Sequence, residues 1–134
     1  MFLDQKMIED LAKNHPDFIS PFNPDLLKPV SYTFRLGGVS GQNENNQSDS
    51  VTLAPGQFLN LESMESINFP KNIMGILSTR GSIAKQGLDC LLSSTVIEPG
   101  SSGKQVLETK NHSDQEVILR IGQPLVKCLF YKLG

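Results

Sequence analysis

Short apolar runs separated by proline and glycine turns occupy the chain from Val51 onward, and this pattern most restricts the fold. The runs are VTLAPGQFLNL, INFPKNIMGIL, TVIEPGSSGKQVLET and VILRIGQPLVKCLFYKL. Several short segments with Pro-Gly or Gly punctuation at near-regular spacing are typical of a β-barrel or β-sandwich. Upstream, SYTFRLGG predicts one more strand that ends in a glycine turn. We therefore expect a mainly β protein.

The N-terminal segment is the part of the chain with helical periodicity. Its apolar positions recur three and four residues apart, at Leu3, Met7, Ile8, Leu11 and Ala12. Pro16 disfavours helix in the residue before it, so the pattern ends there. The sequence predicts one amphipathic helix from Leu3 to Ala12 that packs against the sheet.

Length and composition indicate a single domain that spans residues 1–134. The chain has 134 residues, 38% hydrophobic and 19% charged, which is ordinary for a soluble globular protein with one core. No internal repeat can be aligned. Residues 40–50, SGQNENNQSDS, are polar and predict a loop without chemistry.

Charge and hydropathy exclude several partners. A net charge of -2 argues against a nucleic-acid binder, which would carry a basic patch. The chain has no run of about 18 apolar residues, so no transmembrane helix is expected, and its start lacks the apolar core of a signal peptide. Cys90 and Cys128 lie in apolar surroundings and are expected to be buried and reduced, in the cytoplasm.

Several kinds of catalytic site are incompatible with the sequence. Zinc-dependent base deaminases need closely spaced His and Cys ligands, whereas this chain has two histidines, His15 and His112, and two widely separated cysteines. We therefore expect no zinc. Neither a P-loop nor a dinucleotide-binding glycine motif is present. His15 follows the end of the predicted helix and His112 lies in the turn NHSDQ, so both are expected to be solvated, which argues against a serine hydrolase.

The segment STRGSIAKQGL gathers positive charge on a flexible backbone. It contains Arg80, Ser82 and Lys85, flanked by Gly81 and Gly87. Arg binds phosphate oxygens through its planar fork and Lys binds them as a point charge, so the segment is a candidate phosphate site. A solvated polar turn is the alternative.

Two glutamates are further candidates. Glu98 precedes a Pro-Gly turn, which could direct its carboxylate at a ligand hydroxyl or leave it exposed in a hairpin turn; the segment alone favours the exposed turn. Strand alternation places Glu108 on the same face as Val106, with Leu107 and Thr109 opposite. If the Glu108 carboxylate is partly shielded from water, it is suited to general acid-base catalysis, whereas on an edge strand it would be fully solvated.

The order and spacing of these segments resemble the dCTP deaminase branch of the dUTPase superfamily, over nearly the whole chain. The stretches that carry the resemblance are ISPFNPDLLKPVSYTFRLGG, LAPGQFLNLESMESINFP, STRGSIAKQGL and TVIEPGSSGKQVLETKN. They are similar to the family's Ser-x-Asp-x-Arg-Leu-Gly strand, Thr/Ser-x-Glu-x-Ile/Val-x-x-Pro segment, Gly-Arg-Ser-Ser-Leu-Ala-Arg-x-Gly-Leu motif and Ile-Asp-Pro-Gly…Leu-Glu-x-x-Asn stretch. The comparison needs no gap over residues 76–111.

The resemblance implies a dUTPase-like distorted β-barrel (β-clip) that assembles as a homotrimer with shared active sites. It also implies zinc-independent deamination of a magnesium-bound pyrimidine deoxynucleoside triphosphate, dCTP to dUTP. In that family a glutamate handles the protons of an attacking water, and Glu108 matches it. Arg80 and Ser82 match residues expected near the phosphates, with Lys85 in the same motif, and Glu98 falls where an aspartate contacts the sugar.

The chain departs from the family pattern at several of these positions. Gly81 replaces the motif's first serine, Lys85 replaces its second arginine, and Thr33 replaces the aspartate of the first strand. The printed sequence ends at CLFYKLG, where the family continues into a tail over the triphosphate, so fewer phosphate contacts are expected.

These departures leave two alternatives open. One is a catalytically impaired trimer that binds nucleotide or another protein. The other is dUTP pyrophosphate hydrolysis, as in the sister branch, although no equivalent of that branch's aspartate is evident. Ser93, Ser94 and Thr95 are the candidates to compensate for Gly81.

Overall fold

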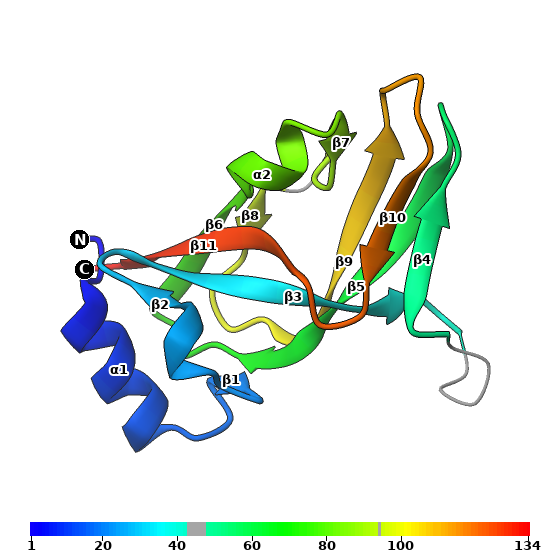
Figure 1. The fold of residues 1–134 in the computed structure, drawn as a ribbon. Helices are drawn as coiled ribbons and strands as arrows, with labels where there is room; N and C mark the ends of the chain where they lie inside the picture. The colour runs from blue at the N-terminus through cyan, green and yellow to red at the C-terminus, as the bar shows by residue number, and fades with distance from the viewer. Residues whose placement is uncertain (43–47, 94) are drawn as a thin grey trace.

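A curled antiparallel sheet forms the body of the protein in a computed structural model that describes residues 1–42, 48–93 and 95–134 (Figure 1). The helical elements are α1 (Gln5–Asn14), the 3-10 turn η1 (Pro24–Leu26) and α2 (Gly81–Ala84). The strands are β1 (Ile19–Ser20), β2 (Leu27–Lys28), β3 (Ser31–Val39), β4 (Ser50–Leu53), β5 (Phe58–Asn68), β6 (Ile73–Thr79), β7 (Leu88–Asp89), β8 (Val96–Ile97), β9 (Ser102–Asn111), β10 (Val117–Arg120) and β11 (Pro124–Lys132). The predicted mainly β fold is confirmed.

The main sheet has the strand order β7-β9-β5-β3-β11-β6-β8, and its paired strands are antiparallel. The short strands β1 and β2 attach to β5 and β3, while β4 and β10 form a separate two-stranded ribbon. Register shifts interrupt the β3–β5 pairing between Leu36 and Gly38 and the β5–β9 pairing between Glu62 and Ser66. Such irregularities bend a sheet and help to close it toward a barrel.

Aromatic side chains fill the core where β3 and β11 meet the N-terminal segment. Phe18 lies 5.2 Å from Phe69 and 5.4 Å from Phe130, measured between ring centroids. Phe18, Phe34 and Phe130 are fully buried. Burial of such side chains contributes about 1.5–3 kcal/mol each, which makes this cluster a main source of stability.

The N-terminal helix begins and ends two residues later than the sequence predicts. Asp4 caps it, because its carboxylate accepts a hydrogen bond from the Met7 N–H at 2.9 Å. Leu3 is left out because its N–H pairs with the Phe130 carbonyl at 2.9 Å. Ile8 is fully buried, so the predicted packing against the sheet is confirmed. In the described part of the chain, no helix is long and apolar enough to cross a bilayer.

The predicted strand and loop segments appear at their expected places. SYTFRLGG lies in β3, but the predicted glycine turn is wrong: the strand continues through both glycines to Val39, with a register shift between Leu36 and Gly38. The apolar runs after Val51 become β4 to β6 and β8 to β11. Residues 40–42 and 48–49 link β3 to β4, whereas 43–47 of the predicted loop lie outside the described residues. Thr33, at the position of the family's aspartate, is buried on β3.

Both cysteines are free and fully buried, as predicted. Burial raises the pKa of Cys90 to about 11 and moves the pKa of Cys128 well above its usual range.

Both thiols are therefore expected to resist Ellman's reagent in the native protein. At about pH 8 an ordinary cysteine has an appreciable thiolate fraction, but burial here removes both the charge and the access. A colorimetric assay is expected to detect the two thiols only in guanidinium. Fast labelling of either cysteine without denaturant would contradict the structure.

Candidate functional site

Glu108 lies on β9, directly across from Asn60 on β5. Its neighbours Leu107 and Thr109 are fully buried on the inner face of the sheet. Glu108 itself is half-buried on the opposite face, beside Val106, which is 49% exposed. The predicted alternation of faces is confirmed, and it gives Glu108 an apolar neighbour together with access to solvent.

The segment between β7 and β8 crosses β9 at Glu108. The Ser93 hydroxyl and the Ser93 N–H both donate hydrogen bonds to Glu108 Oε1, the second at 3.3 Å. One residue earlier, the Leu92 N–H approaches the Glu108 carbonyl at 3.3 Å. The segment between β7 and β8 therefore contacts β9 through hydrogen bonds of both its backbone and the Ser93 side chain.

Of the three residues that the sequence offers as substitutes for the missing serine, Ser93 contacts the carboxylate. Ser94 lies outside the described residues. Thr95 is exposed, and its carbonyl accepts a hydrogen bond from the Leu77 N–H at 2.7 Å, which fastens the segment to β6. The sequence gives no signal that separates Ser93 from its neighbours, because the choice depends on where the segment crosses β9.

The cationic segment forms a single helical turn rather than an irregular loop. Arg80 precedes α2, and its carbonyl accepts hydrogen bonds from Ile83 and Ala84 at 2.9 Å each. The Arg80 N–H donates to Leu125 on β11 at 2.8 Å, which fixes the start of the turn. Arg80, Ser82 and Lys85 are exposed, so all three side chains are available to a ligand.

A glycine turn connects this segment to the strand that carries Glu108. Gly87 has a φ of 89°, which glycine adopts without strain, and its carbonyl accepts the His112 N–H at 2.8 Å. The next residues form β7, in which Leu88 pairs with Asn111 on β9. Figure 1 shows α2 and β7 together near β9. Residues 80–89 and β9 are therefore neighbours in one chain.

The cationic segment and Glu108 are not joined by polar contacts among the described residues of one chain. Across residues 1–42, 48–93 and 95–134, no hydrogen bond or ion pair joins the side chains of the cationic segment to Glu108. Glu98 is also apart from Glu108: it is exposed at the turn after β8, where its carbonyl accepts from the Ser101 hydroxyl at 2.6 Å. The expected exposure of Glu98 is confirmed, but the turn is not a hairpin, because β8 pairs with β6 whereas β9 pairs with β5 and β7.

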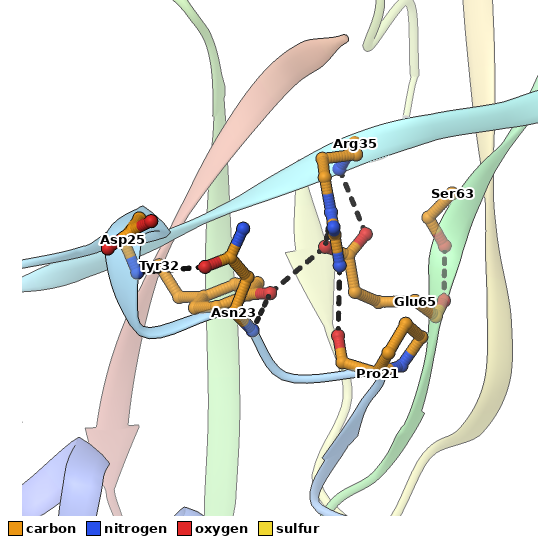
Figure 2. A network of polar contacts seen from close by, with 7 residues as sticks. All are labelled: Pro21, Asn23, Asp25, Tyr32, Arg35, Ser63 and Glu65. Carbon is orange, nitrogen blue, oxygen red and sulfur yellow. Dashed lines mark hydrogen bonds and ion pairs between the residues drawn. The ribbon is translucent and has the colours of Figure 1, made fainter. Parts of the chain in front are cut away.

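The most enclosed charged group is Glu65, which the sequence analysis did not single out (Figure 2). Its side chain is fully buried. The Arg35 N–H and Nε each donate to the carboxylate at 2.9 Å, and the Tyr32 hydroxyl donates to it at 3.0 Å. Arg35 Nη2 also donates to the Pro21 carbonyl at 3.1 Å.

This network is structural, because its hydrogen bonds join β3, β5 and the segment before η1. A buried carboxylate needs such a set of donors to offset its lost hydration. Burial raises the pKa of Tyr32 to about 12, so its hydroxyl remains a donor at neutral pH. Arg35 and Glu65 occupy the Arg and Glu positions of two stretches quoted above, but their pairing depends on the β3–β5 register, which the sequence does not reveal.

Possible metal ligands and the cavity beside α1 identify no further site residues in the described part of the chain. The described part of the chain has no group of three His, Cys, Asp or Glu side chains close enough to hold a metal ion. A cavity of about 450 Å³ lies between α1 and the end of the chain, lined by residues that include Met7, Leu11 and Ile73. None of the predicted site residues lines it.

Comparison with known proteins gives the same family from sequence and from structure. The family model described as dCTP deaminase-like matches residues 39–133, which is more than half of the chain. A protein of Methanospirillum hungatei named "dCTP deaminase, dUMP-forming" is 31% identical over 132 residues, which cover 84% of this chain and 71% of that protein.

Two solved structures share the fold. The 2'-deoxycytidine 5'-triphosphate deaminase of Agrobacterium tumefaciens aligns with a TM-score of 0.78 at 18% identity, covering 99% of this chain and 48% of that one. This chain thus spans about half the length of the Agrobacterium protein. The dUTPase of Streptococcus mutans aligns with a TM-score of 0.61 at 19% identity, covering 84% of this chain and 90% of that one. The chain therefore belongs to the dCTP deaminase-like family, with the dUTPase-like fold.

Proposed function

We propose that this protein deaminates dCTP by hydrolysis, with Glu108 as the general acid-base residue. The observation that carries the proposal is the position of Glu108, a half-buried carboxylate on the outer face of β9 that accepts hydrogen bonds from Ser93. By the sequence resemblance, it is the proposed counterpart of the family's catalytic glutamate. The name of the Methanospirillum relative and the family match support the same reaction.

The reaction needs one group that moves a proton between water and the base. Glu108 accepts a proton from the attacking water as the water oxygen forms a bond to C4 of cytosine. The carboxyl group then returns this proton to the exocyclic nitrogen, the bond from C4 to that nitrogen breaks, and ammonia leaves. The proton of the new C4 hydroxyl moves to N3, which leaves the C4 carbonyl of uracil. The product is dUTP, and Glu108 ends as the carboxylate with which it began.

The cationic segment and Glu98 are the proposed nucleotide contacts. Arg80, Ser82 and Lys85 bind phosphate oxygens, and Glu98 binds the sugar hydroxyl. Mg²⁺ enters with the triphosphate, because this ion keeps several waters and is commonly bound through substrate phosphates.

A homotrimer with shared sites is the proposed assembly. The support is the resemblance to the family, which implies sites shared between subunits. In addition, no hydrogen bond or ion pair among the described residues of one chain joins Glu108 to the side chains of Arg80, Ser82 or Lys85. Sedimentation tests this directly, because a trimer has three times the 14.7 kDa mass of one chain. The two free buried cysteines also support a reducing, cytoplasmic location.

The direct test is incubation with dCTP and Mg²⁺, followed by chromatography of the nucleotides and an ammonia assay. Release of ammonia in step with loss of dCTP supports the proposal. A protein whose melting temperature rises with dCTP while the nucleotide stays intact would instead be a binding trimer, the alternative that Gly81 favours.

The same chromatographic analysis tests a second candidate product, dUMP. The Methanospirillum relative is named as dUMP-forming, so this chain is a candidate for releasing pyrophosphate as well as ammonia. Accumulation of dUMP from dCTP would show both steps. Formation of dUMP from added dUTP, without any reaction of dCTP, would identify a dUTP pyrophosphatase instead.

The variant Gly81→Ser is expected to increase the rate of dCTP deamination by about tenfold, the effect of one added hydrogen bond of about 1.4 kcal/mol in the transition state. The structure accepts the change, since a Cβ at Gly81 meets no atom within 4 Å. Steady-state kinetics measures the effect. Gly81→Ala is the matched control, because it adds the Cβ without the hydroxyl. Equal rates for the two variants would show that the hydroxyl plays no part.

A further inference from the structure

We infer that Ser93 is a positioning residue for Glu108: it holds one carboxylate oxygen so that the other faces the reacting water. The inference rests on the proposed function of Glu108. It gives a role in the reaction to the segment between β7 and β8, which lies outside the central motif STRGSIAKQGL.

The geometry supports this role because two donors from one residue meet the same oxygen. The Ser93 hydroxyl and N–H both donate to Glu108 Oε1. In the described part of the chain, no hydrogen bond reaches Oε2. Among the described residues the carboxylate is therefore bound through Oε1, and we assign Oε2 to the reacting water.

The segment that carries Ser93 is itself fastened on both sides. Before Ser93, the Leu91 N–H donates to the Asp89 carboxylate at 2.8 Å, and the Leu92 N–H approaches the Glu108 carbonyl at 3.3 Å. After it, the Leu77 N–H donates to the Thr95 carbonyl at 2.7 Å. Ser93 is thus held between β9 and β6 instead of swinging freely above the sheet.

Holding the carboxylate in this way has a kinetic consequence. A glutamate side chain has several rotamers, and restricting it before the reaction removes an entropic cost from the proton-transfer step. This effect does not require Ser93 to contact the nucleotide, so the loss of its hydroxyl is expected to lower kcat more than it changes KM.

The experiment compares Ser93→Ala with Ser93→Thr in the full-length protein, by steady-state kinetics with dCTP and Mg²⁺. Loss of a positioning partner typically costs about 10- to 100-fold, so Ser93→Ala is expected to lose that much kcat with little change in KM or melting temperature. Ser93→Thr keeps the hydroxyl, and exposure of this side chain leaves room for its methyl group. This variant is expected to restore most of the rate. A kcat for Ser93→Ala equal to the wild type overturns the inference.

A second measurement does not depend on activity. In NMR spectra, Glu108→Ala is expected to speed the hydrogen exchange of the Ser93 amide, because it removes the acceptor. Unchanged exchange would overturn the positioning contact. If wild-type protein fails to deaminate dCTP while the exchange does respond, the proposed function fails; the inferred role in that reaction fails with it, and the contact alone stands.

Discussion

Glu108→Gln is expected to lower kcat for dCTP deamination by about 10²- to 10⁴-fold, the usual contribution of a general acid-base residue. Glutamine has nearly the same shape and can still accept hydrogen bonds from Ser93, but it cannot take a proton from water at neutral pH. Nucleotide binding is expected to persist, because the phosphate contacts are assigned to other residues. The measurements are the rate of ammonia release and the dCTP-induced rise in melting temperature.

Glu116→Gln is the matched control for this variant. Glu116 is exposed between β9 and β10, and the same substitution there is expected to leave the rate unchanged. Full activity of Glu108→Gln would reject its assigned role. Loss of the dCTP-induced stabilisation together with the rate would instead assign Glu108 to binding.

The largest effect on stability is expected from Arg35→Met, which removes the cationic partner of a fully buried carboxylate. Breaking a buried ion pair by deleting one partner typically costs about 3–5 kcal/mol, because the remaining charge is left uncompensated. Arg35 Nε lies 2.9 Å from Glu65 Oε2, and the Glu65 side chain has no exposed surface. Urea denaturation measures the change as a lower midpoint.

Two further variants test the cause. Lys13→Met removes a pair of similar length, 3.2 Å to Glu9, but the Lys13 side chain is 69% exposed and that of Glu9 39%, so a change of less than about 1 kcal/mol is expected. The double variant Arg35→Met with Glu65→Gln is expected to recover part of the loss, since the buried charge is gone. No recovery would indicate that the packing of the Arg35 stem, rather than its charge, stabilises the fold.

Periodicity and turn residues predict most of the architecture. The apolar runs with Pro-Gly punctuation become strands, and the helix lies two residues from its expected place because Asp4 and the pairing of Leu3 decide where it starts. The outward face of Glu108 also follows from alternation along β9. These features depend on residues that are close together in the sequence, so they can be derived from the sequence directly.

Contacts between distant segments could not be derived in this way. The Arg35–Glu65 pair spans thirty positions and depends on which residues of β3 and β5 face each other. The contact between Ser93 and Glu108 depends on the path of a segment without regular structure, so three adjacent candidates looked alike in the sequence. The joint use of Arg80, Ser82, Lys85, Glu98 and Glu108 by one nucleotide stays a prediction.

The place of β11 has a consequence for how the protein is made. β11 lies between β3 and β6 in the sheet, yet it comes later in the sequence than every strand it joins (Figure 1). While a ribosome is still producing the preceding residues, β3 and β6 each have one unpaired edge. Such edges are templates for wrong pairing with other chains. Nascent copies are therefore most vulnerable to aggregation just before the final strand emerges and closes the gap.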